Sequence, residues 1–326
     1  EAPPAIVSAF IGSQLSELLD ELETSIKAGK LTPEDKTALK LEIGRIPEVL
    51  LDNTDRNRTS TFAFTGNKFE LRAVGSTANC AVPMTVLNTI VSEQLESFKV
   101  AVDQRIDKGE KKDDALLKEL QKLITQSKAI RFEGNGYSDE WVVEAAKRGL
   151  SNLKNTPEAL EVFNRPEVIE LFEKQQVLRK EEVHARVEVE LENYILKLQI
   201  EARVLLQMAR GTILPAAIDY QSQLLLNVQS LNDVFGEDAP KYGGAQLELV
   251  KQAGALIQQI HRESLELDSI HDALEKLESA SEKAKGYAEK MFPSMEALGA
   301  TCAQLEVTVD DALWPLPKFT ELLFTR

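Results

Sequence analysis

Cysteine and histidine are scarce in this sequence: its 326 residues include two cysteines, Cys80 and Cys302, and three histidines. The two cysteines form no CxxC pair, so neither a disulfide framework nor a cysteine zinc site is expected. The histidines are His184, His261 and His271, and none has another histidine four residues away. We therefore interpret them as surface or helix-packing residues rather than metal ligands. So few cysteines suit a reducing compartment, and we expect a cytoplasmic protein.

Long apolar runs and an excess of positive charge are also missing. No stretch approaches the roughly 18 uninterrupted apolar residues of a membrane-spanning helix, and nothing resembles a signal peptide, so we expect no membrane partner. Lysine and arginine number 38 against 53 acidic residues, a net charge of −15. That charge argues against a nucleic-acid partner, because phosphate binding needs a basic field. ATP is not excluded, since a local arginine cluster and a metal can hold a triphosphate inside an acidic protein.

Most of the chain has the apolar spacing of helices, which predicts a mainly α fold with a small β portion. Near the N-terminus we predict a helix over residues 5–28 and a second from Thr32 to about Leu51. Further helices are predicted over 83–105, over 115–130 and from an N-cap at Ser138. From Arg179 onward the pattern predicts two long antiparallel helices. The first is kinked near 211–215, and a turn at Pro240 and Gly243–Gly244 leads into the second, over about 245–290.

One stretch differs from the helical remainder. Residues 55–76 read DRNRTSTFAFTGNKFELRAVGS and are rich in arginine, phenylalanine and glycine. Gly66–Asn67 predicts a tight turn between strands at 60–65 and 68–74. In the second strand one face carries Lys68, Glu70 and Arg72, and the other, which we expect to be buried, carries Phe69, Leu71 and Ala73. Such alternating charge is most often a solvated face, but it can also line a polar cleft.

This stretch and several later blocks carry a family resemblance. The sequences NRTSTFAFTGNKFELRAVGS, PMTVLNTIVSEQL, SDEWVVEAAKRGLSNLKNTPEAL, ARGTILPAAIDYQ and WPLPKFTELLF resemble the C-terminal part of type III glutamine synthetases, and EAPPAIVSAFIGSQL suggests the same family. The resemblance implies that residues 1–106 are the C-terminal part of an α/β catalytic domain, an incomplete barrel, with a helical insertion at about 5–51. Residues 107–326 would form a helical C-terminal region. Because the chain opens inside a catalytic loop of that family, we expect it to be the C-terminal portion of a longer protein.

The resemblance implies an activity: ATP-dependent ligation of ammonia to L-glutamate through a γ-glutamyl phosphate. ATP and Mg²⁺ or Mn²⁺ would be the cofactors, with L-glutamate and ammonium as substrates. The partner would be the protein itself, in a large double-ring homo-oligomer. The family's other metal ligands would lie upstream of Glu1, so we expect this chain to be inactive by itself.

The resemblance also implies roles for individual residues. Glu70 matches the glutamate that ligates a divalent metal, and a carboxylate suits a hard cation. Arg72 matches an arginine that contacts substrate and the transferred phosphate, whose oxygens a planar guanidinium can hold in pairs. Arg58 matches a second arginine at the phosphate and glutamate end. Lys68 occupies a position where other classes carry a nucleotide-contacting arginine. Lysine keeps the positive charge but lacks the planar guanidinium that can hold two oxygens at once.

Two positions depart from a simple match. Glu1 matches, through the letters EAP, the acid on a flap that helps to take a proton from ammonium, although chain ends are commonly disordered. Ala63 stands where other classes carry a further arginine of the phosphate region. Either type III enzymes supply this charge elsewhere or their nucleotide end is arranged differently, and we favour the first explanation.

The alternative hypothesis is a non-catalytic helical scaffold or assembly protein derived from the same family. A scaffold has no use for Arg58, Glu70 and Arg72 together, since unpaired charge facing a cleft is destabilising. Their joint presence favours the enzyme.

Overall fold

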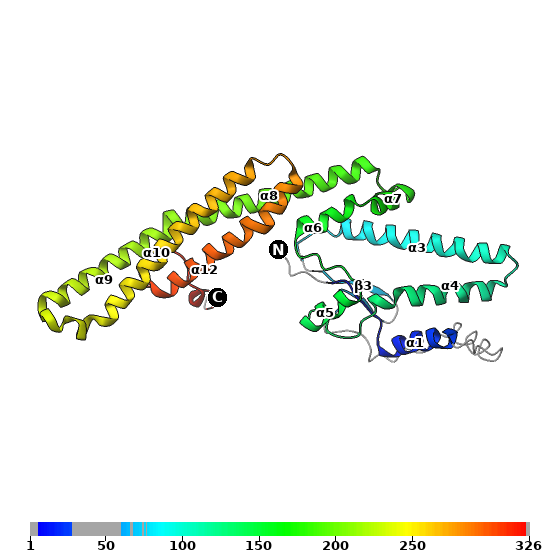
Figure 1. The fold of residues 1–326 in the computed structure, drawn as a ribbon, viewed down its shortest axis with the longest axis horizontal. Helices are drawn as coiled ribbons and strands as arrows, with labels where there is room; N and C mark the ends of the chain where they lie inside the picture. Colours follow the sequence, from blue (N-terminus) through cyan, green and yellow to red (C-terminus); the bar gives the residue numbers. More distant parts are fainter. Residues whose placement is uncertain (1–5, 28–59, 66–67, 74, 76, 324–326) are drawn as a thin grey trace. The chain divides into compact units, whose positions relative to one another are not determined.

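The computed structural model describes residues 6–323 apart from 28–59, 66–67, 74 and 76. The chain folds into two compact units (Figure 1). The first takes Glu1–Asn155 with Asn164–Val183, and the second takes Thr156–Phe163 with His184–Arg326. Among the described residues helices dominate and strands are few, which confirms the predicted mainly α fold with a small β portion.

The first unit contains a three-stranded sheet in the order β1-β2-β3. β1 (Ala9–Phe10) runs parallel to β2 (Phe62–Phe64), and β2 runs antiparallel to β3 (Phe69–Leu71). Main-chain bonds from Arg72 N to Thr61 O (2.7 Å) and from Thr65 N to Lys68 O (2.8 Å) extend the β2–β3 pairing at both ends. The predicted hairpin is therefore confirmed, and its turn residues lie outside the described part of the chain.

The start of the chain differs from the prediction. The helix predicted from residue 5 begins only at Ser13, as α1 (Ser13–Lys27), and the preceding Ala9–Phe10 is a strand. Gly12 has a φ of 87°, a left-handed conformation that ends the strand and that glycine adopts without strain. The N–H groups of Ile11 and Gly12 donate to the Glu133 carboxylate, at 3.2 and 2.9 Å. The helix predicted from Thr32 to Leu51 lies outside the described residues.

The other elements described in the first unit are helices. The predicted helix over 83–105 is confirmed as α3, and Ser138 caps α5 as predicted, its side chain accepting from Trp141 N. Trp141 and Ala145 of this helix are buried, whereas Val142 is 43% exposed. The elements after the sheet are α3 (Ala81–Asp107), α4 (Lys112–Gln126), η2 (Ser127–Ile130), α5 (Asp139–Lys147) and α7 (Pro166–Lys174).

The second unit is built on the predicted long helices. α8 (Lys180–Met208) continues through a π-helical turn, η4 (Ala209–Ile213), into α9 (Leu214–Phe235), so the helix is irregular next to the kink predicted near 211–215. The chain reverses at η5 (Gly236–Asp238), where Gly236 has a φ of 52°, and α10 (Ala239–Glu275) returns along α9 (Figure 1). The turn predicted at Gly243–Gly244 is wrong: both residues lie inside α10, and Gly243 is buried close to Leu231.

The predicted helix over 245–290 is also shorter than expected. α10 ends at Glu275, and Ser279 then caps a separate helix by accepting from Glu282 N. The remaining elements of the unit are α11 (Ala280–Gly286), the π-helical η6 (Tyr287–Met291), α12 (Phe292–Thr308) and the short α6 (Thr156–Glu161), η3 (Val162–Asn164) and α13 (Phe319–Leu322).

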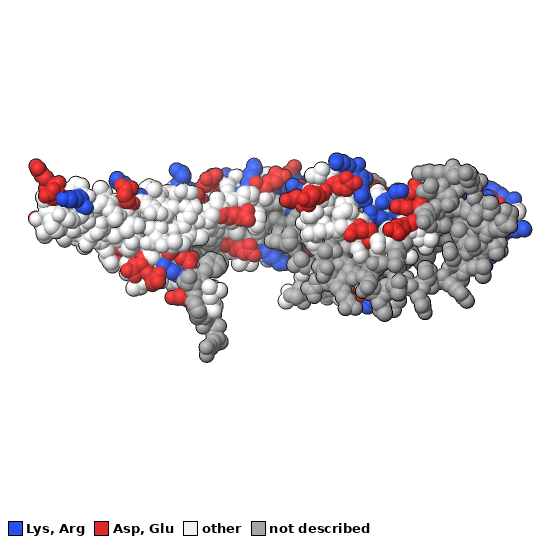
Figure 2. Space-filling view, turned by 90° about the horizontal axis from the view of Figure 1, so that it is seen from below, with Lys and Arg blue, Asp and Glu red and all other residues white. Residues whose placement is uncertain are grey.

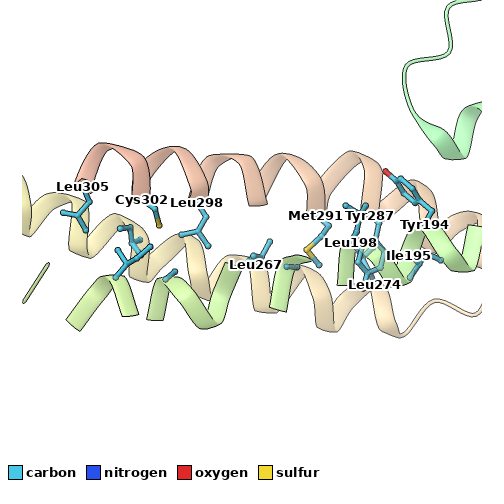
Figure 3. Close-up of a cluster of buried hydrophobic side chains, with 14 of the residues drawn as sticks. Tyr194, Ile195, Leu198, Leu267, Leu274, Tyr287, Met291, Leu298, Cys302 and Leu305 are labelled. Carbon is cyan, nitrogen blue, oxygen red and sulfur yellow. The ribbon is translucent and has the colours of Figure 1, made fainter. Parts of the chain in front are cut away.

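A hydrophobic core joins these helices. Leu267 of α10 and Leu298 of α12 are fully buried, as are Met291 and Tyr287 of η6. Figure 3 shows the side chains of α12 and η6 directed toward α10 and α8. Burial of this apolar seam stabilises the unit, because each enclosed large side chain contributes roughly 1.5–3 kcal/mol.

A hydrogen-bond network lies at one end of this core. The Tyr287 hydroxyl donates to Glu275 Oε1 at 3.1 Å and lies 3.0 Å from His271 Nδ1. Gln199 Nε2 donates to the same oxygen of Glu275 at 2.6 Å. Burial raises the pKa of Tyr287 to about 12. Burial also raises the pKa of Glu275, but the Tyr287 hydroxyl, Lys283 and Gln199 outweigh it and hold that pKa below its ordinary value.

Tyr287→Phe is expected to destabilise the second unit by about 1–2 kcal/mol at pH 7, because it removes a bond to a charged carboxylate that is partly screened by water. The folded pKa of Glu275 is depressed, so its contribution is present above its unfolded pKa of 4.5 and is lost as pH falls through the lower folded pKa. The difference between variant and wild type should therefore shrink below pH 4.5.

Urea unfolding can measure this difference. The sequence has two tryptophans, Trp141 in the first unit and Trp314 in the second, so the emission of Trp314 in a Trp141→Phe background reports on the second unit. A difference in unfolding free energy between the Tyr287→Phe variant and the wild type that grows toward low pH would contradict the assigned network.

The surface carries mixed charge. On the face shown in Figure 2, acidic and basic side chains are interspersed and lie beside broad uncharged areas, and the described surface shows no continuous basic area. No helix in the described ranges is both long enough and apolar enough to span a membrane.

Candidate functional site

The hairpin strand β3 places three of the predicted site residues together. Glu70 lies in β3, and Lys68 and Arg72 flank it two residues away on either side. Glu70 Oε1 is 3.3 Å from Lys68 Nζ, and Glu70 Oε2 is 3.4 Å from Arg72 Nη2. The alternation of a strand explains this grouping, because residues two apart point to the same face.

The opposite face of the hairpin is aromatic. The rings of Phe62 and Phe69 stack with centroids 4.9 Å apart, and Phe64 and Phe69 lie 5.2 Å apart. The predicted separation of charged and apolar faces is therefore confirmed. The prediction that the apolar face is buried is wrong within the described residues, since Phe69 is 48% and Leu71 41% exposed. Stacking within the hairpin covers only part of these side chains.

The charges around Glu70 favour its ionised form. The Lys68 ammonium lowers the pKa of Glu70, partial burial opposes that shift, and Arg72 adds to the lowering. The Arg72 side chain is 20% exposed, whereas that of Lys68 is 64% exposed. Arg72 is accordingly the more fixed of the two cations, and the exposed Lys68 can move away from the carboxylate at little cost.

The backbone explains why Arg72 is held firmly. Its N–H donates to Thr61 O, so its main chain is part of the β2–β3 ladder. Across that ladder Ala63 pairs with Glu70 and, on its other side, with Phe10 of β1. Directly paired residues point to the same face of a sheet, so the side chain of Ala63 lies beside that of Glu70.

Ala63 also bears on the missing arginine. Its side chain is fully buried, and the residue pairs with Phe10 on one side and with Glu70 on the other. The position where other classes carry a phosphate-region arginine is a packing position in this chain.

Two predicted site residues, Glu1 and Arg58, lie outside the described residues. Within the described part of the chain, no group of three or more histidine, cysteine or acidic side chains could hold a metal ion. Among the predicted site residues that the structure describes, Glu70 is the one that carries a carboxylate, the kind of ligand that a hard divalent cation prefers. The residues present would thus supply one ligand of a larger site.

The sequence gives no signal for one contact that supports this region. The Glu133 carboxylate accepts from the N–H groups of Ile11 and Gly12 and from Ser16 Oγ (2.7 Å). It thereby fixes the start of α1 next to β1, across more than a hundred residues of sequence. No local motif marks a glutamate that caps a helix from such a distance.

Comparisons with known proteins agree with this arrangement. A family model described as the glutamine synthetase C-terminal domain matches residues 115–232. A glutamine synthetase of Bacteroides fragilis is 45% identical over the whole chain, and this alignment covers 45% of the relative. A type-3 glutamine synthetase of Dictyostelium discoideum is 33% identical over the whole chain and is covered to 44%.

A third relative, a glutamine synthetase of Butyrivibrio fibrisolvens, is 30% identical over the whole chain and is covered to 45%. The chain thus spans less than half the length of these relatives. The matches begin before the hairpin and continue through the long helices of the second unit. Residues 115–232 thus match the glutamine synthetase C-terminal domain, and the whole chain is similar to glutamine synthetases, a type-3 enzyme among them.

Proposed function

We propose that this chain is part of a glutamate–ammonia ligase that forms L-glutamine from L-glutamate, ammonium and ATP. One observation carries the proposal: in a chain similar to glutamine synthetases, Glu70 lies between Lys68 and Arg72 on one face of a strand. The reaction needs a metal-binding carboxylate beside cations that bind phosphate oxygens, and this group has both kinds of side chain.

Each residue would have a separate role. The Glu70 carboxylate would be one ligand of Mg²⁺ or Mn²⁺, which would neutralise charge on the phosphates of ATP. Arg72, fixed by its backbone bond to Thr61, would bind oxygens of the transferred phosphoryl group or of glutamate. Lys68 would contact the nucleotide.

The two residues outside the described part would complete these functions. Arg58 would act with Arg72 at the phosphate, and Glu1 would help to remove a proton from ammonium. The γ-glutamyl phosphate is prone to hydrolysis, so the complete site must exclude water while ammonia attacks.

The proposal extends to the organisation of the protein. Residues 1–106 would belong to the catalytic domain and 107–326 to a helical C-terminal region. The protein would assemble into a large double-ring homo-oligomer and would act in the cytoplasm.

The function is tested by measuring phosphate release from ATP by the native-length protein, with glutamate and ammonium omitted in turn. Release that requires both substrates, with glutamine as product, is the expected result. The isolated 326-residue chain should produce no glutamine, because one metal ligand does not make a site. Glutamine formation by that chain would show that it contains a full site, and no activity in the native-length protein would favour the scaffold.

A further inference from the structure

The hydroxyl of Ser60 lies buried at the junction of β1 and β2. Ser60 and Ser8 are each 1% exposed. Ser60 Oγ donates to the Ser8 carbonyl oxygen at 3.1 Å, and it accepts from Phe62 N at 3.3 Å. The two hydroxyl oxygens are 3.4 Å apart. A serine hydroxyl has one proton and two lone pairs. The Ser60 proton can be donated to the Ser8 carbonyl oxygen or to the Phe62 carbonyl oxygen at 3.3 Å, and the Ser8 oxygen is the nearer of the two.

These bonds fix how β2 lies against β1. Ser8 and Ser60 are 52 residues apart in sequence and lie just before the paired residues Ala9 and Phe62. β1 is held on its other side by Phe132 N, which donates to Ala9 O at 3.1 Å. The strand that receives β2 is therefore itself fixed, and the Ser60 hydroxyl connects the two strands.

Register matters here because of what β3 carries. The residue after Ser60 is Thr61, whose carbonyl oxygen accepts from Arg72 N. Ala63, two residues further along β2, pairs with Glu70. A slip of one residue in a strand moves every side chain to the opposite face of the sheet. A shift of β2 would thus displace both Glu70 and Arg72.

We propose that Ser60 is a positioning residue, whose buried hydroxyl sets the register of β2 on β1 and so holds Glu70 and Arg72 in their reactive positions. This inference rests on the proposed function. Ser60 touches neither substrate nor metal in this role. It acts through the bond from its hydroxyl to the Ser8 carbonyl oxygen and through the main-chain bond from Arg72 N to Thr61 O. Strand β2 is only three residues long, so few other bonds can replace this one.

The test compares Ser60→Ala and Ser8→Ala in the native-length protein. Both changes remove one equally buried hydroxyl. Ser8→Ala leaves the main-chain oxygen that accepts from Ser60, so it removes only the longer contact. We expect Ser60→Ala to lower kcat/KM for glutamate about tenfold or more, since misplacement by about 1 Å can cost 100-fold. The half-saturating concentration of Mn²⁺ should rise several-fold. For Ser8→Ala, kcat/KM for glutamate and the half-saturating concentration of Mn²⁺ should both stay within about twofold of the wild-type values.

The readouts separate positioning from a loss of folded protein. A variant that merely folds less well has fewer active molecules, and its KM and half-saturating Mn²⁺ concentration stay at the wild-type values. If Ser60→Ala has a wild-type KM and a wild-type half-saturating Mn²⁺ concentration, whether or not its kcat is lowered, the inference is overturned and the proposed function stays intact. If Ser60→Ala does not fold, Ser60→Cys, which keeps the shape and has a weak donor, is measured with the same expectation. A wild-type protein without glutamine formation would overturn the proposed function and this inference together.

Discussion

Glu70→Gln in the native-length protein is expected to lower glutamine formation by roughly 100-fold or more while leaving folding and assembly unchanged. Glutamine keeps the shape of the side chain and removes the charge that would bind Mg²⁺ or Mn²⁺. Loss of a residue that only hydrogen-bonds to a metal ligand costs about 10–100-fold, so loss of a direct ligand should cost at least as much. The measurement is phosphate release from ATP that depends on ammonium and glutamate, with the metal concentration varied.

The matched control is Glu170→Gln, since Glu170 is an exposed residue of α7. It should leave activity within about twofold of wild type, as surface substitutions away from special features have small effects. Equal activity of the Glu70 variant and wild type would mean that β3 is wrongly assigned to the metal site. Loss of activity together with loss of folding would instead assign Glu70 a structural role.

Leu267→Ala is expected to destabilise the second unit by about 2–5 kcal/mol, because the change leaves a cavity in a core that is closely packed. Leu267 is fully buried in α10, in the core formed with α12 and α8 (Figure 3). Urea unfolding followed by the emission of Trp314 in a Trp141→Phe background measures the loss. A native protein is stable by only about 5–15 kcal/mol, so this single change removes a large share.

Leu265→Ala provides the comparison within the same helix. Leu265 is two residues away and 54% exposed, so its replacement should change stability by no more than about 0.5 kcal/mol. If the two alanine variants unfold at the same urea concentration, the assigned buried face of α10 is wrong. If both alanine variants unfold at lower urea concentrations than the wild type, the exposed face of α10 also carries contacts that stabilise the native protein.

Local sequence predicted the hairpin well. The dipeptide Gly66–Asn67 indicates a turn, and the alternation around Glu70 separates charged from aromatic residues whatever the rest of the fold does. Long helices were equally predictable, since apolar residues at helical spacing over tens of positions form one continuous face only in a helix. The resemblance to glutamine synthetases rests on the same stretches, and the relatives confirm it.

Predictions failed where distant residues decide the local structure. Ile6 and Phe10 have helical spacing with later residues, yet the segment Ala9–Phe10 pairs with β2 and the helix begins only at Ser13. Likewise Gly243–Gly244 has the composition of a turn but lies in α10, where Gly243 allows close packing against Leu231. In both places tertiary contacts outweigh an intrinsic preference of about 1 kcal/mol.

By itself the sequence determined the mainly helical character of the protein, the hairpin and the joint placement of Lys68, Glu70 and Arg72 on one strand face, because each follows from the period of a helix or strand. Tertiary structure decided which strand pairs with the hairpin, where the first helix begins and how Ser60 is bonded. Those features depend on contacts between residues 52 to more than 100 positions apart, such as Ser8 with Ser60 and Gly12 with Glu133. Such contacts form only when the chain folds, and no local pattern records them.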